Sequence, residues 1–396
     1  MIKNVDVIIF VEHKDRELES IEKLSETLKE SGLKILVLSI HFHLHYLMFY
    51  KAKVYVFPYL INRNDWPCSL VYKMYGNSVR YLNLNWEQLL SKANIAYKKP
   101  QDEFVKNEVS HIAWNQNFKD YLILNGVRDG NVHITGNPAN EILFEMTGEY
   151  DKWRQKLSME LGLNIQKKWI FFPMNYAWAF ATDSKIKSKI AKGFPADVAW
   201  DYRAYSKKCL LEFIPFVNEL SKNKHTEIII RPHPTITESD YEAVFNTEIG
   251  FVPDNVLINK SYSIREWIVA SDLIGSSWST SVWDAYNIGK PAFLFNPYER
   301  PDWLHVWWND TVCNISKVED LDSIKKVDGS FSVAKTSELI SGLVKNLYEG
   351  SSPKLNKGIS QLSLKEILKI MRCLARNSGM LRNPALEYDK FNVFHK

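Results

Sequence analysis

The sequence predicts an α/β protein of two domains, each built on a parallel β-sheet that helices cover on both faces. Its 396 residues exceed the length at which a single hydrophobic core usually stops growing. Short apolar runs alternate with amphipathic segments, as strands and helices do around a parallel sheet. The alternation is interrupted near residues 145–165 and then starts again. We therefore expect one domain over 1–150, a second over 151–355, and a helical tail over 356–396 that packs back on the first domain.

The first domain is expected to contain six strands and two helices. The strands are predicted over Val5–Val11, Lys34–Ile40, Val54–Phe57, Val79–Leu84, Ser110–Ile112 and Val132–Thr135. Arg16–Ser31 carries leucine and isoleucine at helical spacing and ends at Gly32, which predicts a helix between the first two strands. Gln116–Gly126 is expected to form the second helix.

The second domain repeats this alternation. Strands are predicted over Trp169–Pro173, Glu227–Arg231, Val256–Ile258, Leu273–Gly275 and Ala292–Phe295, and helices over Glu149–Leu163, Tyr202–Lys222, Ile264–Ala270 and Ser281–Ile288. The segment 175–200 is longer than an ordinary loop of such a domain, and we interpret it as a lid or a substrate-binding insertion.

The composition excludes several classes of protein. The 50 basic and 46 acidic residues are interspersed, so the net charge of +4 gives no signature of nucleic-acid binding. The four cysteines are scattered and form no CxxC pair, which argues against a zinc site or a disulfide framework and fits a reducing cytoplasm. No apolar stretch reaches the roughly 18 residues of a membrane span, and the N-terminal apolar run is too short for a signal peptide. Any membrane association, at the inner face of the cytoplasmic membrane, is expected to be peripheral.

A rigid turn follows one of the predicted strands. The run Ile228–Ile230 leads directly into Arg231, Pro232, His233 and Pro234. Prolines fix their own backbone and restrict the preceding residue, so His233 is held at the carboxyl end of the strand, where α/β proteins bind ligands. A guanidinium and an imidazole there can together neutralise a phosphate. The alternative is a proline-stiffened surface turn.

A hydroxyl-rich loop follows another predicted strand and leads into a helix. Its hydroxyl residues are Ser276, Ser277, Ser279, Thr280 and Ser281. Free backbone amides and the helix dipole make this position suited to a phosphate, whereas helix capping would explain only one of the five hydroxyls. One turn into the helix, Asp284 is expected to bind ribose hydroxyls, although an ordinary solvated carboxylate would give the same sequence.

With these motifs, parts of the chain resemble a known family. The strings IIIRPHP, DNVLINKSYSIREWIVASDLIGSSWSTSVWDAYNIGKPAF and SHIAWNQNFKDYLILNGVRDGNVHITGNP are similar to segments of bacterial surface-carbohydrate glycosyltransferases. These include capsule transferases for 3-deoxy-octulosonate (Kdo), polysialyltransferases and CDP-glycerol glycerophosphotransferases. The resemblance covers about residues 75–300 and implies the GT-B fold, with two Rossmann-like domains facing a central cleft.

The resemblance also implies a donor and its ligands. A CMP-linked acidic sugar is the donor in the polysialyltransferase-like enzymes, where a His-Pro pair and a serine-rich loop bind the phosphate and the nucleotide. Carried over, these positions are His233, Pro234, Ser276, Ser277, Ser279 and Thr280, and Arg231 is shared with the wider group. We expect no cofactor, since the chain has neither a DxD motif nor a GxxxxGK[ST] phosphate loop, and no metal.

The catalytic base is expected in the first domain. Relatives carry an acidic pair followed by glycine after a strand, and in Tyr81–Gln88 only Glu87 remains of that pattern. A desolvated Glu87 could take the proton of the acceptor hydroxyl, although an acidic residue also favours the start of a helix over 86–97. His13, after the first strand, is an acceptor contact or an alternative base.

The remaining candidates would contact the acceptor or the donor sugar. Asn175 follows the first strand of the second domain, and Lys185 begins a lysine-rich run that continues with Lys187, Lys189 and Lys192. A solvated helix face explains these lysines equally well. His41, His43 and His45 would share one side of an extended backbone, a spacing that can hold a metal, but an acceptor-binding loop is the favoured interpretation.

We therefore expect a metal-independent glycosyltransferase that takes a nucleotide-sugar donor and a glycan or lipid-linked glycan acceptor. The alternatives are a polyol phosphotransferase using CDP-glycerol or CDP-ribitol, a UDP-sugar transferase, and a 2-epimerase-like enzyme that needs no acceptor. A nucleotide-sugar-binding scaffold without catalytic activity is the non-enzyme alternative.

Overall fold

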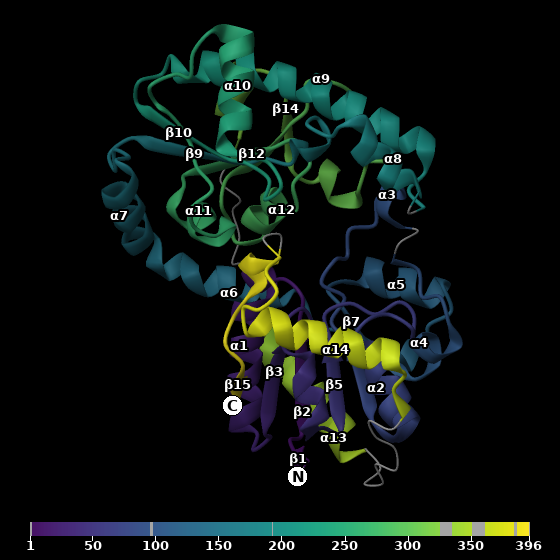
Figure 1. Cartoon of the computed structure of the whole chain (residues 1–396). Coiled ribbons are helices and arrows are strands. Elements are labelled where there is room, and N and C mark those ends of the chain that lie inside the picture. Colours follow the sequence, from purple (N-terminus) through teal and green to yellow (C-terminus); the bar gives the residue numbers. More distant parts are fainter. Residues whose placement is uncertain are drawn as a thin grey trace. The chain divides into compact units, whose positions relative to one another are not determined.

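The computed structural model describes residues 2–95, 98–191, 193–324, 335–350, 361–383 and 386–395. The chain divides into two compact units (Figure 1). Unit 1 comprises Met1–Leu89, Tyr97–Ile142 and Val333–Lys396, and unit 2 comprises Leu90–Ala96 and Leu143–Ser332. Helix α6 (Pro138–Met146) carries the chain from unit 1 into unit 2.

Unit 1 is built on a seven-stranded sheet with the order β15-β3-β2-β5-β6-β7-β8. All neighbours are parallel except the edge pair of β15 with β3. The strands are β2 (Val7–Val11), β3 (Ile35–Ser39), β5 (Val54–Phe57), β6 (Arg80–Asn83), β7 (Val109–Ala113), β8 (Val132–Ile134) and β15 (Phe394–His395). A separate short pair joins β1 (Lys3–Asn4) to β4 (Tyr50–Lys51).

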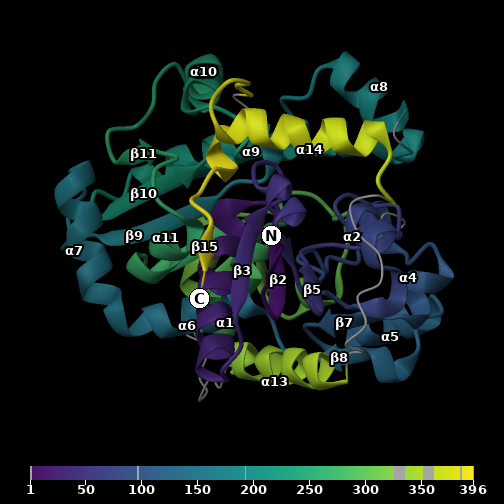
Figure 2. The same cartoon turned by 60° about the horizontal axis from the view of Figure 1, so that its bottom comes forward.

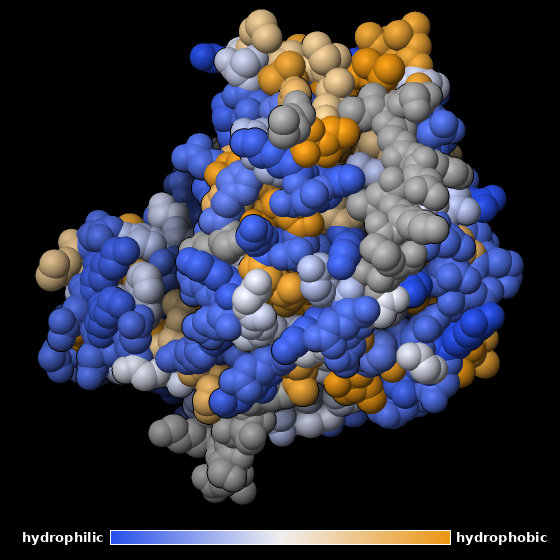
Figure 3. Space-filling model, turned by 90° about the horizontal axis from the view of Figure 1, so that it is seen from below, coloured by the Kyte–Doolittle hydropathy of each residue, from blue (hydrophilic) through white to orange (hydrophobic). Residues whose placement is uncertain are grey.

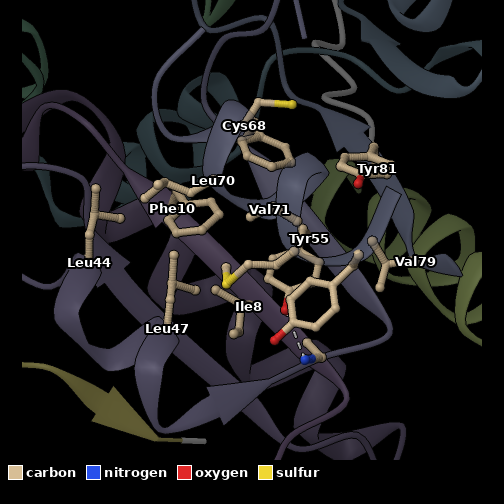
Figure 4. Close-up of a cluster of buried hydrophobic side chains, with 14 of the residues drawn as sticks. Ile8, Phe10, Leu44, Leu47, Tyr55, Cys68, Leu70, Val71, Val79 and Tyr81 are labelled. Carbon is tan, nitrogen blue, oxygen red and sulfur yellow. Dashed lines mark hydrogen bonds between the residues drawn. The ribbon is translucent and has the colours of Figure 1, made fainter. Parts of the chain in front are cut away.

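Helices cover both faces of this sheet, because its central strands are apolar on both sides. On one face, α1 (Lys14–Glu30) packs with α13 (Thr336–Glu349) over Val7, Ile9 and Val37. On the other, α2 (Cys68–Tyr75) and α14 (Leu364–Asn377) pack over Ile8 and Phe10. Figure 2 shows the two helices, and Figure 4 shows side chains of α2 beside Ile8 and Phe10. The smaller helices of this part of the chain are α4 (Glu103–Asn107) and α5 (Gln116–Leu124).

Unit 2 is built on a six-stranded sheet, entirely parallel, with the order β11-β10-β9-β12-β13-β14. The strands are β9 (Lys168–Pro173), β10 (Thr226–Arg231), β11 (Val256–Ile258), β12 (Leu273–Ser276), β13 (Ala292–Phe295) and β14 (Cys313–Ile315). The helices are α3 (Lys92–Ile95), α7 (Tyr150–Leu161), α8 (Asp183–Ala191), α9 (Ala196–Ser221), α10 (Glu238–Ile249), α11 (Ile264–Ala270) and α12 (Thr280–Asn287).

Local sequence signals begin and end the helices of unit 2. Thr237 and Asp240 form a reciprocal capping box at the start of α10, and Gly250 ends that helix at φ +85°. Ser263 and Glu266 form the same box at the start of α11. Short 3₁₀ turns connect other elements: η1 (Leu44–Met48), η2 (Gly76–Ser78), η4 (Asp129–Asn131), η5 (Thr147–Glu149), η6 (Tyr176–Trp178), η7 (Trp307–Asp310), η8 (Val318–Ser323) and η10 (Glu387–Asp389).

The predicted α/β class is confirmed, and the differences concern boundaries and helices. The predicted division between domains at residue 150 falls at 142/143 instead, and residue 355 lies outside the described residues. Residues 336–349, expected in the second domain, form helix α13 of unit 1, which packs on α1. Helix α9 begins at Ala196, six residues before the predicted start at Tyr202.

Two further expectations concern individual segments. The helix considered over 86–97 is limited to α3, because the residues before Lys92 are not helical. The long insertion after β9 consists of η6 and α8, and its Lys192 lies outside the described residues. Among the helices that the structure describes, none has the length and apolar character needed to cross a membrane.

Candidate functional site

The two predicted phosphate-binding segments flank the same strand of unit 2. Strand β9 lies between β10 and β12, and all three are parallel, so their carboxyl ends share one edge. The Met174 amide donates to the carbonyl of Arg231 at 2.9 Å, and the Ser276 hydroxyl donates to the carbonyl of Pro173 at 2.7 Å. Since neighbouring strands lie about 4.8 Å apart, the ends of β10 and β12 are separated by roughly 10 Å.

Arg231 is fixed at this edge by a strained residue. Its guanidinium donates through Nε and Nη2 to the carbonyl oxygen of Tyr262, at 3.3 and 3.0 Å. Tyr262 has φ +67°, a left-handed conformation that residues other than glycine adopt rarely and that is concentrated at functional sites. The half-buried arginine is therefore oriented before any ligand binds.

His233 is an uncharged hydrogen-bond donor in this structure. Its Nδ1 accepts the Thr235 amide at 3.2 Å, which assigns the proton of the neutral ring to Nε2. Burial and the positive charges of Lys185, Lys260 and Arg231 lower the pKa of His233 to about 4. The expectation that this imidazole helps to neutralise a phosphate by its charge does not fit a ring that burial, together with the surrounding cations, keeps neutral at pH 7.

Several cationic side chains act on the His-Pro turn. Lys185 and Lys189 on α8, Lys260 after β11, and Arg231 all act electrostatically on His233. Lys260 is held by its ammonium group, which donates to the carbonyls of Pro234 and Ile236 at 2.9 and 2.8 Å. Lys185, predicted only as a contact for the acceptor or donor sugar, therefore lies close enough to influence the His-Pro turn. Such a concentration of positive charge favours an anionic ligand.

Two of the predicted phosphate ligands serve the fold instead. Ser276 is buried and donates to the carbonyl of Pro173. Ser277 is buried, and its hydroxyl lies 2.6 Å from that of Tyr176. A role for these hydroxyls in binding phosphate does not fit this geometry, because both are already engaged inside unit 2.

The start of α12 retains the features of an anion site. Ser279 is the N-cap, and its hydroxyl accepts the Ser281 amide at 3.3 Å. Thr280, the first residue of the helix, is exposed. The orphan amides and the positive end of the helix dipole therefore face the edge at which β9 and β10 also end.

Asp284 differs from an ordinary surface carboxylate. It lies on α12, and burial raises the pKa of its carboxyl group to about 7, against the opposing attraction of Arg265. Close to neutral pH a small change in environment therefore changes its charge. The Asp284 carboxyl must be ionised to accept two ribose hydroxyls, and near pH 7 its protonated and ionised forms are both populated.

Two more polar groups stand at the same edge. Asn175, which follows β9, has a buried amide nitrogen without a hydrogen-bond partner, while its Oδ1 lies 3.5 Å from the Ser276 hydroxyl. Arg300, after β13, donates from Nη2 to the carbonyl of Ser277 at 3.1 Å, and its buried Nε has no partner. Sequence analysis missed Arg300, because it stands five residues beyond its strand and belongs to no motif. The one sequence feature that could have pointed to Arg300 is its position shortly after the predicted strand Ala292–Phe295.

In unit 1, Glu87 does not have the environment expected of a general base. Its side chain is 63% exposed and pairs with Lys98 at 3.3 Å and with Arg16 at 3.4 Å. Burial opposes ionisation, but the two cations outweigh it and lower the pKa of Glu87. The predicted desolvated carboxylate with a raised pKa is therefore wrong, because Lys98, which is buried, takes Glu87 as its counter-ion.

His13 has the surroundings that Glu87 lacks. It stands directly before α1 at the carboxyl end of β2, and its Nδ1 lies 3.4 Å from Oδ2 of Asp389. The other oxygen of Asp389 accepts the amide of Lys14 at 3.0 Å. The interaction with Asp389 raises the pKa of His13. A partly exposed imidazole oriented by a carboxylate is the arrangement of a general base. Asp389 had no sequence signal, since it lies in the C-terminal tail.

The alternating histidines do not share one side of a strand. Strand β3 ends at Ser39, and the chain then turns into η1. His43 is buried and accepts the Ser39 amide on Nδ1 at 3.1 Å, so it closes that turn. Within the described ranges, no group of three or more histidine, cysteine, aspartate or glutamate side chains is arranged to hold a metal ion.

Comparison with known proteins identifies the fold. No family model and no curated protein matches the sequence. A solved structure of the wall teichoic acid polymerase TagF, variant H548A, is similar with a TM-score of 0.54 and 12% identity over 88% of this chain and 90% of that chain. A TagF H444N variant soaked with CDPG gives 0.50, with 12% identity over 88% and 90% of the two chains.

Two epimerases show the same likeness. UDP-GlcNAc 2-epimerase from Neisseria meningitidis bound to UDP-GlcNAc matches with a TM-score of 0.53 and 13% identity, over 87% of this chain and all of that one. The enzyme from Methanocaldococcus jannaschii gives 0.54 and 11%, over 88% of this chain and all of that one. The predicted architecture is thereby confirmed: the chain has the GT-B fold, with two Rossmann-like domains.

Proposed function

We propose that the chain is a glycosyltransferase that moves a sugar from a nucleotide-activated donor to a hydroxyl group of a surface glycan. The observation that carries the proposal is the cationic edge of unit 2, where Arg231, Lys185 and Lys260 act electrostatically on His233 and where α12 also begins. This arrangement supports binding of a phosphate group. The likeness to TagF and to the UDP-GlcNAc 2-epimerases supports a donor that carries a nucleotide.

In this proposal unit 2 stabilises the leaving nucleotide. Arg231, Lys260 and the α12 amides offset the negative charge that develops on the phosphate, while Nε2–H of neutral His233 donates a hydrogen bond to it. A bound phosphate also reverses the local potential, which raises the pKa of His233 and lets it supply a proton to the departing oxygen. Asp284 accepts the ribose hydroxyls. No metal is required for these steps, since protein groups supply the positive charge.

Unit 1 supplies the base. The acceptor hydroxyl attacks the anomeric carbon, the bond from that carbon to the phosphate oxygen breaks, and the hydroxyl proton passes to Nε2 of His13. Asp389 stabilises the imidazolium that forms. We propose His13 in this role in place of Glu87, because a carboxylate held ionised by two cations is a weak base.

The donor predicted from the sequence, a CMP-linked acidic sugar, remains our proposal for the activated sugar. The second candidate is transfer of a polyol phosphate from CDP-glycerol. It is favoured by the number of cations around His233, which exceeds the charge of one phosphate, and by the TagF structure soaked with CDPG. The acceptor is proposed to be a glycan or lipid-linked glycan at the cytoplasmic face of the membrane.

Nucleotide binding to the full chain tests the proposal. We expect calorimetric binding of CMP or CDP, unchanged by EDTA and weakened about tenfold or more by Lys260→Gln. Lys168→Gln is the matched control, because this exposed lysine begins β9 at the opposite edge of the sheet. If the chain binds UDP but neither CMP nor CDP, both proposed cytidine donors are wrong. If Lys260→Gln and Lys168→Gln bind the nucleotide with equal affinity, the proposed site is wrong.

Product analysis then separates the candidate reactions. A glycosidic bond supports the glycosyltransferase, and a phosphodiester supports the polyol phosphotransferase. An isomerised sugar formed without acceptor supports the epimerase-like alternative. If the chain binds the donor but shows no turnover with any glycan or polyol acceptor, the result supports a nucleotide-sugar-binding scaffold without catalytic activity.

A further inference from the structure

Helix α14 presents an apolar face to solvent. It lies on the α2 face of the unit 1 sheet, where Ile370 and Cys373 join the core, and Glu366 pairs with Lys73 of α2. A helix that only covers a core carries polar residues on its outward side. On α14, however, Leu364 is 73%, Leu368 53% and Met371 47% exposed. The apolar surface of this helix is therefore wider than the part that the core covers.

The exposed apolar residues form one stripe. Leu364, Leu368 and Met371 stand at positions i, i+4 and i+7, so they share one side of the helix. Just beyond the helix, Met380 and Leu381 are also exposed. Figure 3 shows apolar side chains gathered along the upper edge of the face of the molecule that it presents, among polar ones.

A row of positive charges runs beside the stripe. Lys365, Lys369 and Arg372 are exposed and are again spaced at i, i+4 and i+7, about a quarter turn around the helix from the stripe. Half-buried Arg376 continues the row, and the Lys369 ammonium lies 4.7 Å from the centre of the Trp66 ring. Glu366, the one acidic residue in the α14 sequence, is occupied by Lys73. The helix therefore combines an apolar edge with a basic edge, which is the composition of helices that lie in the interface of an anionic bilayer.

We propose that α14 docks this chain on an anionic lipid surface. Leucine and methionine enter the boundary of the acyl chains, while the lysine and arginine side chains reach the phosphate groups beside them. A second copy of the chain fits less well, because it would bring a second basic row against the first. Helix α14 would be the surface responsible for the peripheral membrane association expected from the sequence. This inference does not depend on which nucleotide donor the chain uses.

Sedimentation of the full chain with vesicles tests the proposal. We expect binding to vesicles of phosphatidylglycerol mixed with phosphatidylcholine, weaker binding to phosphatidylcholine alone, and loss of binding at high salt. The triple variant Leu364→Gln, Leu368→Gln, Met371→Gln should bind at least about tenfold more weakly. Lys365→Gln with Arg372→Gln should also lose roughly tenfold, and only on anionic vesicles.

A matched control separates this surface from general hydrophobicity. Leu124→Gln, Met159→Gln and Leu339→Gln remove apolar side chains at least as exposed from other helices, and this triple variant should bind as the wild type does. Circular dichroism and thermal unfolding confirm that each variant is folded. Equal binding by the two triple variants, or no vesicle binding by the wild type, would overturn the proposal.

Two further readouts complete the test. If the wild type forms a dimer that the α14 triple variant disperses, and no vesicle binding occurs, the face belongs to a second copy and the proposal fails. Nucleotide affinity is measured separately on the same proteins. Loss of vesicle binding with intact nucleotide binding tests only this inference, whereas failure of nucleotide binding bears only on the proposed function.

Discussion

Replacing Asp284 with asparagine tests the electrostatics of the candidate donor site directly. Burial raises the pKa of Asp284 from its ordinary 3.8 to about 7. Between these values the folded protein keeps a proton that the unfolded chain has lost, so stability falls as pH rises through this window and is constant above it. At about 1.4 kcal/mol for each pH unit, the full cost of ionisation is roughly 4 kcal/mol. Solvent at the half-buried carboxyl reduces this, and we expect about 2–4 kcal/mol.

The assay compares thermal unfolding of the wild type and Asp284→Asn at two pH values. Near pH 4 the Asp284 carboxyl is protonated in the folded protein and only about half ionised in the unfolded chain, so the two proteins should melt within about 2 °C of each other. Near pH 8 only the wild type carries a half-buried charge, so the variant should melt roughly 5–10 °C higher. The contributions of the other titrating groups to stability are the same in both proteins, so they do not affect the difference in melting temperature. A difference between the proteins that is the same at both pH values would refute the reasoning.

The same variant tests the proposed contact with ribose. Cytidine has no phosphate, so its binding reports the nucleoside contacts without titration of the ligand's own phosphate. An ionised carboxylate accepts ribose hydroxyls better than a protonated one, so cytidine affinity of the wild type should rise with pH through about 7. Asp284→Asn should show a flat profile. If cytidine affinity depends on pH in the same way for both proteins, Asp284 does not contact the ribose.

The other predictions concern four individual side chains. His13→Gln should lower kcat by about 10²–10⁴-fold, and Asp389→Asn should move the acidic limb of the pH–rate profile to lower pH, because Asp389 raises the pKa of His13. Glu87→Gln should keep most turnover but cost about 1–2 kcal/mol in a denaturant titration, since buried Lys98 loses its counter-ion. Ser276→Ala should cost about 1–2 kcal/mol of stability and leave nucleotide affinity unchanged in calorimetry, because its hydroxyl is bonded within the fold.

Much of the fold could be predicted from local pattern. Strands β5, β11 and β13 and helix α11 have the predicted bounds, because each is a compact apolar or amphipathic run between clear turn residues. Helices α10 and α13 were not predicted, although α10 carries a capping box and a terminal glycine. Placing α13 on α1 required the contacts themselves, since packing of distant segments leaves no periodic signal in either one.

The candidate site divides in the same way. The sequence by itself determined that a proline-clamped histidine and a hydroxyl-rich helix start stand at strand ends, because prolines, glycines and apolar runs act through neighbouring residues. Tertiary structure alone decided the charge of His233, since its pKa is lowered by burial and by Lys185 and Lys260, which belong to other elements. It also joined Asp389 to His13 across most of the chain. Ionisation depends on burial and on charges nearby in space, and these are set only when segments far apart in sequence pack together.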